Sequence, residues 1–136
     1  MGQGQRLLAW SIVRVPAELW PDEASAQPFY AVVVSSDELR AASGIVWLCP
    51  VRPRDAIVAD QWHIALAQKK TKATALSWLG GAKSDEPETA ELHDYVVVAS
   101  LVITATQNEI APTNYGAVDQ NTQRKIASKL HSLIRA

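Results

Sequence analysis

Two apolar runs lie so close together in this chain that they limit its fold to an antiparallel sheet. Residues 29–35 and 44–51 are rich in β-branched side chains and are typical of buried strands. Only residues 36–43 separate them, whereas a parallel crossover needs about a dozen residues or more. We therefore expect two central strands that pair antiparallel, joined by a short connection.

Further strand signals precede and follow this pair. Residues 12–15 form a short β-branched run, which a Pro-rich loop ends. Residues 62–66 alternate, so that His63 points away from the face that its apolar neighbours share. Residues 95–103 are the last strong strand signal, with a bend or bulge expected near residues 99–100, where β propensity drops.

The end of the chain changes from strand to helix periodicity. The helical spacing is carried by Ile126, Leu130, Leu133 and Ile134, and Asp119 is a plausible N-cap. Four or five strands followed by one amphipathic helix predict a mainly β fold, a small antiparallel barrel with the C-terminal helix packed on it.

Length and composition limit the functions that this chain can have. With 136 residues, of which 48% are hydrophobic, the chain is expected to form one domain, 1–136, with an inserted segment around 69–94. The net charge of -1 provides no general attraction to nucleic acid. A single cysteine, Cys49, and the absence of a run of about 20 apolar residues predict a cytoplasmic protein with no membrane partner.

Four segments together resemble a known family. They are Gln27-Pro-Phe-Tyr-Ala-Val-Val-Val-Ser35, Gly44-Ile-Val-Trp-Leu-Cys-Pro-Val-Arg52, Tyr95-Val-Val-Val-Ala-Ser-Leu-Val-Ile-Thr104 and Tyr115-Gly-Ala-Val-Asp-Gln-Asn-Thr-Gln123. In order and spacing they are similar to the MazF/PemK toxins and, more loosely, to CcdB. The resemblance implies an SH3-like barrel of the CcdB/MazF/PemK type. It also implies a homodimeric toxin of a type II toxin-antitoxin system, which an antitoxin protein neutralises and which cleaves single-stranded RNA without a metal or cofactor.

The chain departs from this family where the chemistry is expected. The family Arg before the Pro and the Thr that closes the third strand correspond to Gln27 and Arg52, and the family Gly-Asp pair corresponds to Trp10 and Ser11. One alternative is therefore a catalytically silent relative that acts by binding a protein, either a gyrase-type target or a regulatory partner. Another is a structural barrel without toxicity.

Three residues are candidates for catalysis. Arg52 can supply a guanidinium to a phosphate, Gln27 supplies neutral donors, and His63 can accept the proton of a ribose 2′-hydroxyl, since imidazole titrates near neutral pH. The chain has no Gly-rich phosphate loop and no His pair at metal spacing, so neither a cofactor nor a metal is expected.

A basic segment is the candidate RNA-binding surface. It comprises Arg54, Lys69, Lys70 and Lys72, and Trp20, in a Pro-flanked acidic loop, could stack on a base. The alternative is a solvated loop whose charge the acidic residues 85–94 offset. Of the other tryptophans, Trp47 and Trp62 are expected to pack in the core.

Overall fold

The computed structural model describes residues 9–19, 29–53, 61–66, 70–72, 74–75, 89–91, 95–110 and 113–134. The strands are β1 (Ser11–Val15), β2 (Phe29–Val33), β3 (Ile45–Pro53), β4 (His63–Ala65), β5 (Lys70–Lys72), β6 (Thr74–Ala75), β7 (Thr89–Glu91), β8 (Tyr95–Val98), β9 (Ile103–Thr106) and β10 (Thr113–Ala117). The helices are α1 (Asp37–Ser43) and α2 (Gln120–Ile134), with 3-10 turns η2 (Ala17–Leu19) and η5 (Gln107–Glu109).

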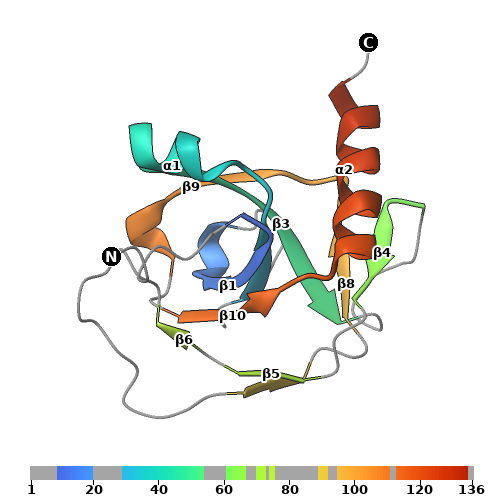
Figure 1. Cartoon of the computed structure of the whole chain (residues 1–136), viewed down its shortest axis with the longest axis horizontal. Coiled ribbons are helices and arrows are strands. Elements are labelled where there is room, and N and C mark those ends of the chain that lie inside the picture. Colours follow the sequence, from blue (N-terminus) through green and yellow to red (C-terminus); the bar gives the residue numbers. More distant parts are fainter. Residues whose placement is uncertain are drawn as a thin grey trace.

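Most of these strands belong to one antiparallel sheet. Its order is β4-β8-β3-β2-β1-β10-β6, and β9 also pairs with β3. The sheet curls into a half-barrel with α2 standing beside β8 and β4 (Figure 1). Strands β5 and β7 form a separate pair. The mainly β class with a C-terminal helix is therefore confirmed.

The two central strands pair as their short connection predicts. The antiparallel register of β2 and β3 runs from Tyr30 opposite Val51 to Val33 opposite Leu48. The connection itself is the helix α1, which the sequence analysis did not anticipate. Ser36 caps it, its Oγ accepting from the Leu39 N–H at 3.2 Å, and Gly44 ends it in the left-handed conformation, with φ of 75°.

The apolar run 95–103 forms two strands rather than one. A turn at residues 99–100 separates β8 from β9, where the sequence predicted only a bend or bulge. Both strands then pair with the long strand β3, β8 along residues 51–53 and β9 along residues 45–48. The break in the run thus lets one chain segment cover most of one edge of β3 while the sheet curls.

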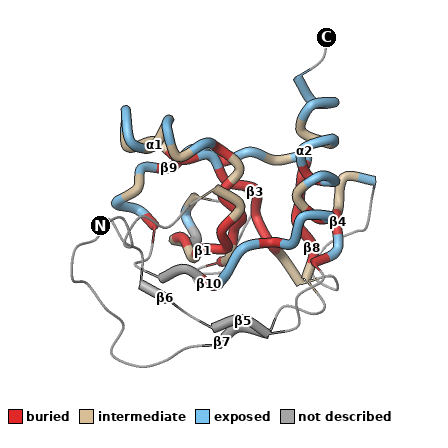
Figure 2. The backbone as a smooth tube through the Cα atoms, viewed as in Figure 1, coloured by how far each residue is buried: buried red, intermediate tan, exposed pale blue. Residues whose placement is uncertain are grey.

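Figure 2 shows buried residues in red along the central strands. Because side chains alternate along a strand, these residues form two apolar cores, one on each face of the sheet. We call the face on which α2 packs the helix face and the other the opposite face. Residues of the helix-face core include Ile12, Val32, Cys49, Val51, Ile64, Val97, Tyr115 and Ile126. Residues of the opposite-face core include Val13, Val15, Phe29, Ala31, Val33, Leu48, Val98 and Ile103.

Helix α2 begins and packs as expected, but its last turn does not. The Asp119 carboxylate accepts from the Thr122 N–H at 3.3 Å and from its hydroxyl, as an N-cap does. Ile126 is fully buried, whereas Leu133 and Ile134 are exposed, Ile134 by 80%. The last turn of the helix extends beyond the sheet on which the helix packs. No helix within the described ranges is long and apolar enough to cross a membrane.

Trp10 carries a mark of the resemblance in its backbone. It precedes β1 with φ of 69°, the left-handed conformation that favours glycine, and it stands where the MazF/PemK pattern has its glycine. Its N–H donates to the Val33 carbonyl at 2.6 Å, and its carbonyl accepts from the Val118 N–H at 3.0 Å. The backbone hydrogen bonds of Trp10 therefore connect the ends of β2 and β10, in a conformation that is strained for a residue other than glycine.

Candidate functional site

Three strand ends meet at one end of the sheet, where the sequence analysis expected the catalytic residues. Strand β2 begins there at Phe29, β3 ends at Pro53 and β8 begins at Tyr95, with Tyr30 opposite Val51 and Pro53 opposite Tyr95. We call this region the β3 end. Gln27 precedes β2 by two positions and lies outside the described residues, so its expected proximity to Arg52 stays a prediction.

Arg52 and His63 project from the same face of the sheet. In the register, Arg52 lies opposite Val96, which lies opposite Ala65, and His63 lies opposite Val98. Residues that pair across strands share a face of the sheet. The Arg52 and His63 side chains therefore both project from the opposite face, whereas Val51 and Ile64 belong to the helix face. Both are half-buried. Two strand spacings across β8, together with the two-residue offset along it, put their backbones about 12 Å apart, a span that a bound nucleotide can bridge.

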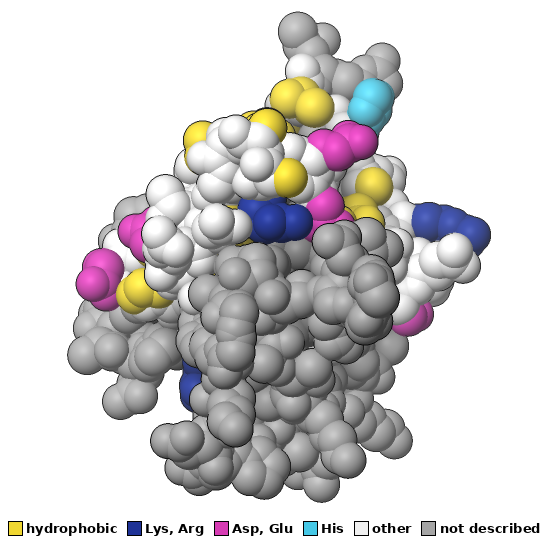
Figure 3. Space-filling view, turned by 60° about the vertical axis from the view of Figure 1, so that its left-hand side comes forward, with side chains coloured by type: hydrophobic (Ala, Val, Ile, Leu, Met, Phe, Trp, Pro, Cys, Tyr) yellow, Lys and Arg dark blue, Asp and Glu magenta, His cyan; other side chains and the backbone are white. Residues whose placement is uncertain are grey.

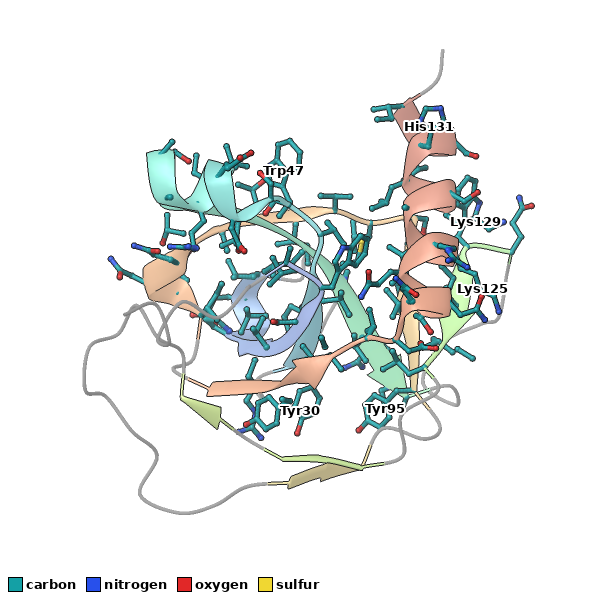
Figure 4. All side chains as sticks on the ribbon, viewed as in Figure 1. Tyr30, Trp47, Tyr95, Lys125, Lys129 and His131 are labelled. Atoms are coloured by element: carbon teal, nitrogen blue, oxygen red, sulfur yellow. The ribbon has the colours of Figure 1, made fainter. Side chains whose placement is uncertain are left out.

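The helix face of the β3 end carries an aromatic cluster that the sequence analysis missed. The Tyr30 ring meets Tyr115 edge-on at 5.2 Å and Tyr95 at 6.2 Å between centroids, and the Arg14 guanidinium lies 5.5 Å from the Tyr30 ring. Figure 4 shows Tyr30 and Tyr95 together below the sheet. These are all three tyrosines of the chain. Only the strand register brings them together, since they lie far apart in sequence.

A basic groove of about 410 Å³ lies between β4 and α2. Its lining residues are Gln61, His63, Ile64, Arg124, Lys125, Ser128 and Lys129. Figure 4 shows Lys125 and Lys129 on the side of α2 that faces β4. The sequence analysis did not select these helix cations, although α2 contains no Asp or Glu to balance them. This excess of positive charge in α2 was the sequence signal that could have identified these residues.

An apolar groove of about 450 Å³ lies on the other side of α2. Its lining residues are Val34, Trp47, Val102, Thr104, Leu130, Leu133 and Ile134. Trp47 was expected in the core, yet it is 46% exposed, because it alternates with Val46 and Leu48 to the helix face, at a point that α2 leaves uncovered. Trp62 is half-buried, with the Lys129 ammonium 5.3 Å from its ring centre.

The predicted RNA-binding residues lie mostly beyond what the structure describes. Trp20, Arg54 and Lys69 fall outside the described residues, and for Lys70 and Lys72 only the backbone in β5 is described. The β5–β7 register sets Lys70 opposite Glu91. The register thus pairs an acidic position with a basic one, which is what the alternative of a solvated segment with offset charge expects.

Cys49 is placed for packing rather than for chemistry. It is fully buried in the helix-face core, and burial raises the pKa of its thiol to about 12. In the part of the chain that is described, no three His, Cys, Asp or Glu side chains come together as a metal site.

The comparisons with known proteins concern the fold. No family model and no curated protein matches the chain. It does match the solved structure of MazF (form I) from Deinococcus radiodurans, with a TM-score of 0.60 and 16% identity over 93% of this chain and 94% of that one. A MazE-MazF complex (form II) from the same organism gives a TM-score of 0.58 at 16% identity, covering 93% and 92%.

A third solved structure is an endoribonuclease in complex with its cognate antitoxin from a mycobacterial species. Its TM-score is 0.56 at 15% identity, and the match covers 93% of this chain and 91% of that one. The chain therefore has the fold of the MazF toxins over nearly its whole length, while the low identity says nothing of its active-site residues.

Proposed function

Because the chain has the MazF fold, we propose that it is the toxin of a toxin-antitoxin pair and cleaves single-stranded RNA. The observation that carries the proposal is the placement of Arg52 and His63 on one face across β8, with Arg52 at the end of the sheet where the resemblance sets the chemistry. An acid-base group and a cation facing one surface are the minimum that metal-free transphosphorylation requires.

In the proposed reaction, His63 accepts the proton of a ribose 2′-hydroxyl. The O2′ atom attacks the adjacent phosphorus, the O2′–P bond forms, and the P–O5′ bond breaks in line with it. The leaving O5′ takes up a proton from solvent water, so the products are a 2′,3′-cyclic phosphate and a 5′-hydroxyl. The Arg52 guanidinium holds the phosphoryl oxygens, whose negative charge grows in the transition state. Gln27, if it lies beside Arg52, adds neutral donors.

The test is cleavage of mixed single-stranded RNA in the presence of a chelator. We expect Arg52→Gln to lower the rate by roughly 10²–10³, since one charge-stabilising donor is worth about that much. His63→Asn removes the proton acceptor and should lower the rate by roughly 10²–10⁴. Glu38→Gln, an exposed change in α1, is the control. RNA that stays intact at high protein excess contradicts the nuclease proposal.

The silent-relative alternative rests on the replacement of the family residues by Gln27 and Arg52. The double variant Gln27→Arg with Arg52→Thr separates the two. A silent relative should gain RNA cleavage, whereas an enzyme whose cation has moved to Arg52 should lose it. A structural barrel without toxicity predicts that expression does not arrest growth.

We further propose that the protein is a homodimer and that the apolar groove is part of its interface. None of the described residues that line this groove is charged. Such a surface suits a second copy of itself, since symmetric contacts avoid like-charge pairs and interface cores are poor in charged residues.

An antitoxin partner is also part of the proposal. Loss of growth arrest on coexpression with the neighbouring gene would support it.

A further inference from the structure

The basic groove between β4 and α2 concentrates positive charge that none of its described lining residues offsets. Arg124, Lys125 and Lys129 supply three cations within about one and a half helical turns, and the described lining contains no acidic residue. The chain as a whole has a net charge of -1. On the face drawn in Figure 3, acidic and basic side chains of the described part are interspersed. The groove is thus a local feature rather than a property of the whole surface.

Aromatic and polar groups accompany these cations. Lys129 lies over the half-buried Trp62 ring, and His63, Gln61 and Ser128 line the same groove. Cations interleaved with aromatic rings are the combination that binds single-stranded nucleic acid, because the cations contact phosphates while the rings contact bases. Among the lining residues that the structure describes, Ile64 is the one apolar residue. A protein segment, which needs apolar anchors, has little to hold there.

We propose that this groove binds the phosphodiester backbone of single-stranded RNA beside the cleaved bond. The proposal rests on the proposed nuclease function and deepens it. His63 connects the two regions, since it borders the groove at the edge strand β4 and leaves the same face as Arg52. An RNA strand that passes over β4 thus contacts Arg124, Lys125 and Lys129 with its flanking phosphates while Arg52 holds the reacting one.

The experiment measures binding of a fluorescent 2′-O-methyl oligoribonucleotide, which cannot be cleaved, by anisotropy over a series of salt concentrations. The test variant is Arg124→Gln with Lys125→Gln. We expect about tenfold weaker binding and a slope of log K against log salt that is smaller by about 1.4, at roughly 0.7 per phosphate contact on a single strand. Circular dichroism checks that the variant is folded.

The matched control is Ala42→Glu with Asn108→Asp, two exposed positions away from the groove. It changes the net charge by the same two units, so it should bind RNA nearly as the wild type does. If the control and the test variant lose RNA affinity equally, the effect is due to net charge, and the proposal that the groove binds RNA is refuted.

Cleavage of unmodified RNA, measured in parallel, separates the two proposals. If the wild type cleaves RNA but the test variant binds and cleaves as the wild type does, the groove is wrong and the nuclease function stands. If the wild type neither binds nor cleaves RNA, both fail. If an acidic peptide such as polyglutamate binds the groove more tightly than the oligonucleotide, the ligand is a protein and the RNA proposal is refuted.

Discussion

Replacing Ile134 by Gln tests whether the apolar groove joins two copies of the chain. Ile134 is 80% exposed in the single chain, so the change should leave the fold nearly intact. Full burial of an Ile side chain stabilises by about 2 kcal/mol. Burying the exposed four-fifths of this side chain in each copy of a symmetric dimer contributes about 3 kcal/mol in all. The dimer dissociation constant should therefore rise by roughly 200-fold.

Sedimentation velocity over a concentration series measures this shift directly. Ser132→Gln is the matched control, because it adds the same side chain at an exposed position of the same helix that does not line the groove. Thermal melts should place the two variants close together. The reasoning is refuted if Ile134→Gln dissociates at the same concentration as the wild type, or if the wild type is a monomer throughout.

Three further changes test the fold. Ile126→Ala removes a fully buried contact of α2 and should lower the free energy of unfolding by about 2–5 kcal/mol in urea titration; a loss below 1 kcal/mol would mean that α2 does not hold the helix-face core. Asp119→Ala removes the cap on Thr122 and should cost about 1 kcal/mol by the same measurement, with an unchanged value contradicting the cap. Burial raises the pKa of Cys49 from 9.0 to about 12, so above pH 9 the folded chain keeps a proton that the unfolded chain releases. The free energy of unfolding should then fall by about 1.4 kcal/mol per pH unit relative to Cys49→Ala, and parallel pH profiles would refute this.

Local sequence signals predicted the apolar strands and the final helix, through the β-branched runs, the eight-residue connection and the helical spacing after Asp119. Four or five strands were expected where the described residues form ten: β5, β6, β7 and β10 are short and lack an apolar run, and they were missed. The helix α1 was missed although Ser36 and Gly44 mark its two ends, because the segment was read only as a connection. The last apolar run was predicted as one strand, since residue pattern alone does not show that β3 pairs with its two halves separately.

The candidate site was predictable only in part. Arg52 and His63 were selected from their residue types and places in the pattern; the register sets them on one face, and their catalytic roles stay a prediction. Arg124, Lys125 and Lys129 were not selected, because they lie in the last helix and their groove exists only where α2 meets β4. Likewise Trp47 looked like a core residue, and only the position of α2 leaves it exposed.

The sequence by itself determined where the apolar strands lie along the chain, the alternation that buries one side chain in two, and the helix that follows. These depend on neighbours within a few residues, where sterics and apolar periodicity act. The tertiary structure alone decided which side chains share a surface: the three tyrosines, the cations beside β4 and the apolar groove. Such groupings depend on register and on the angle at which α2 packs, and both are set by the sum of many distant contacts.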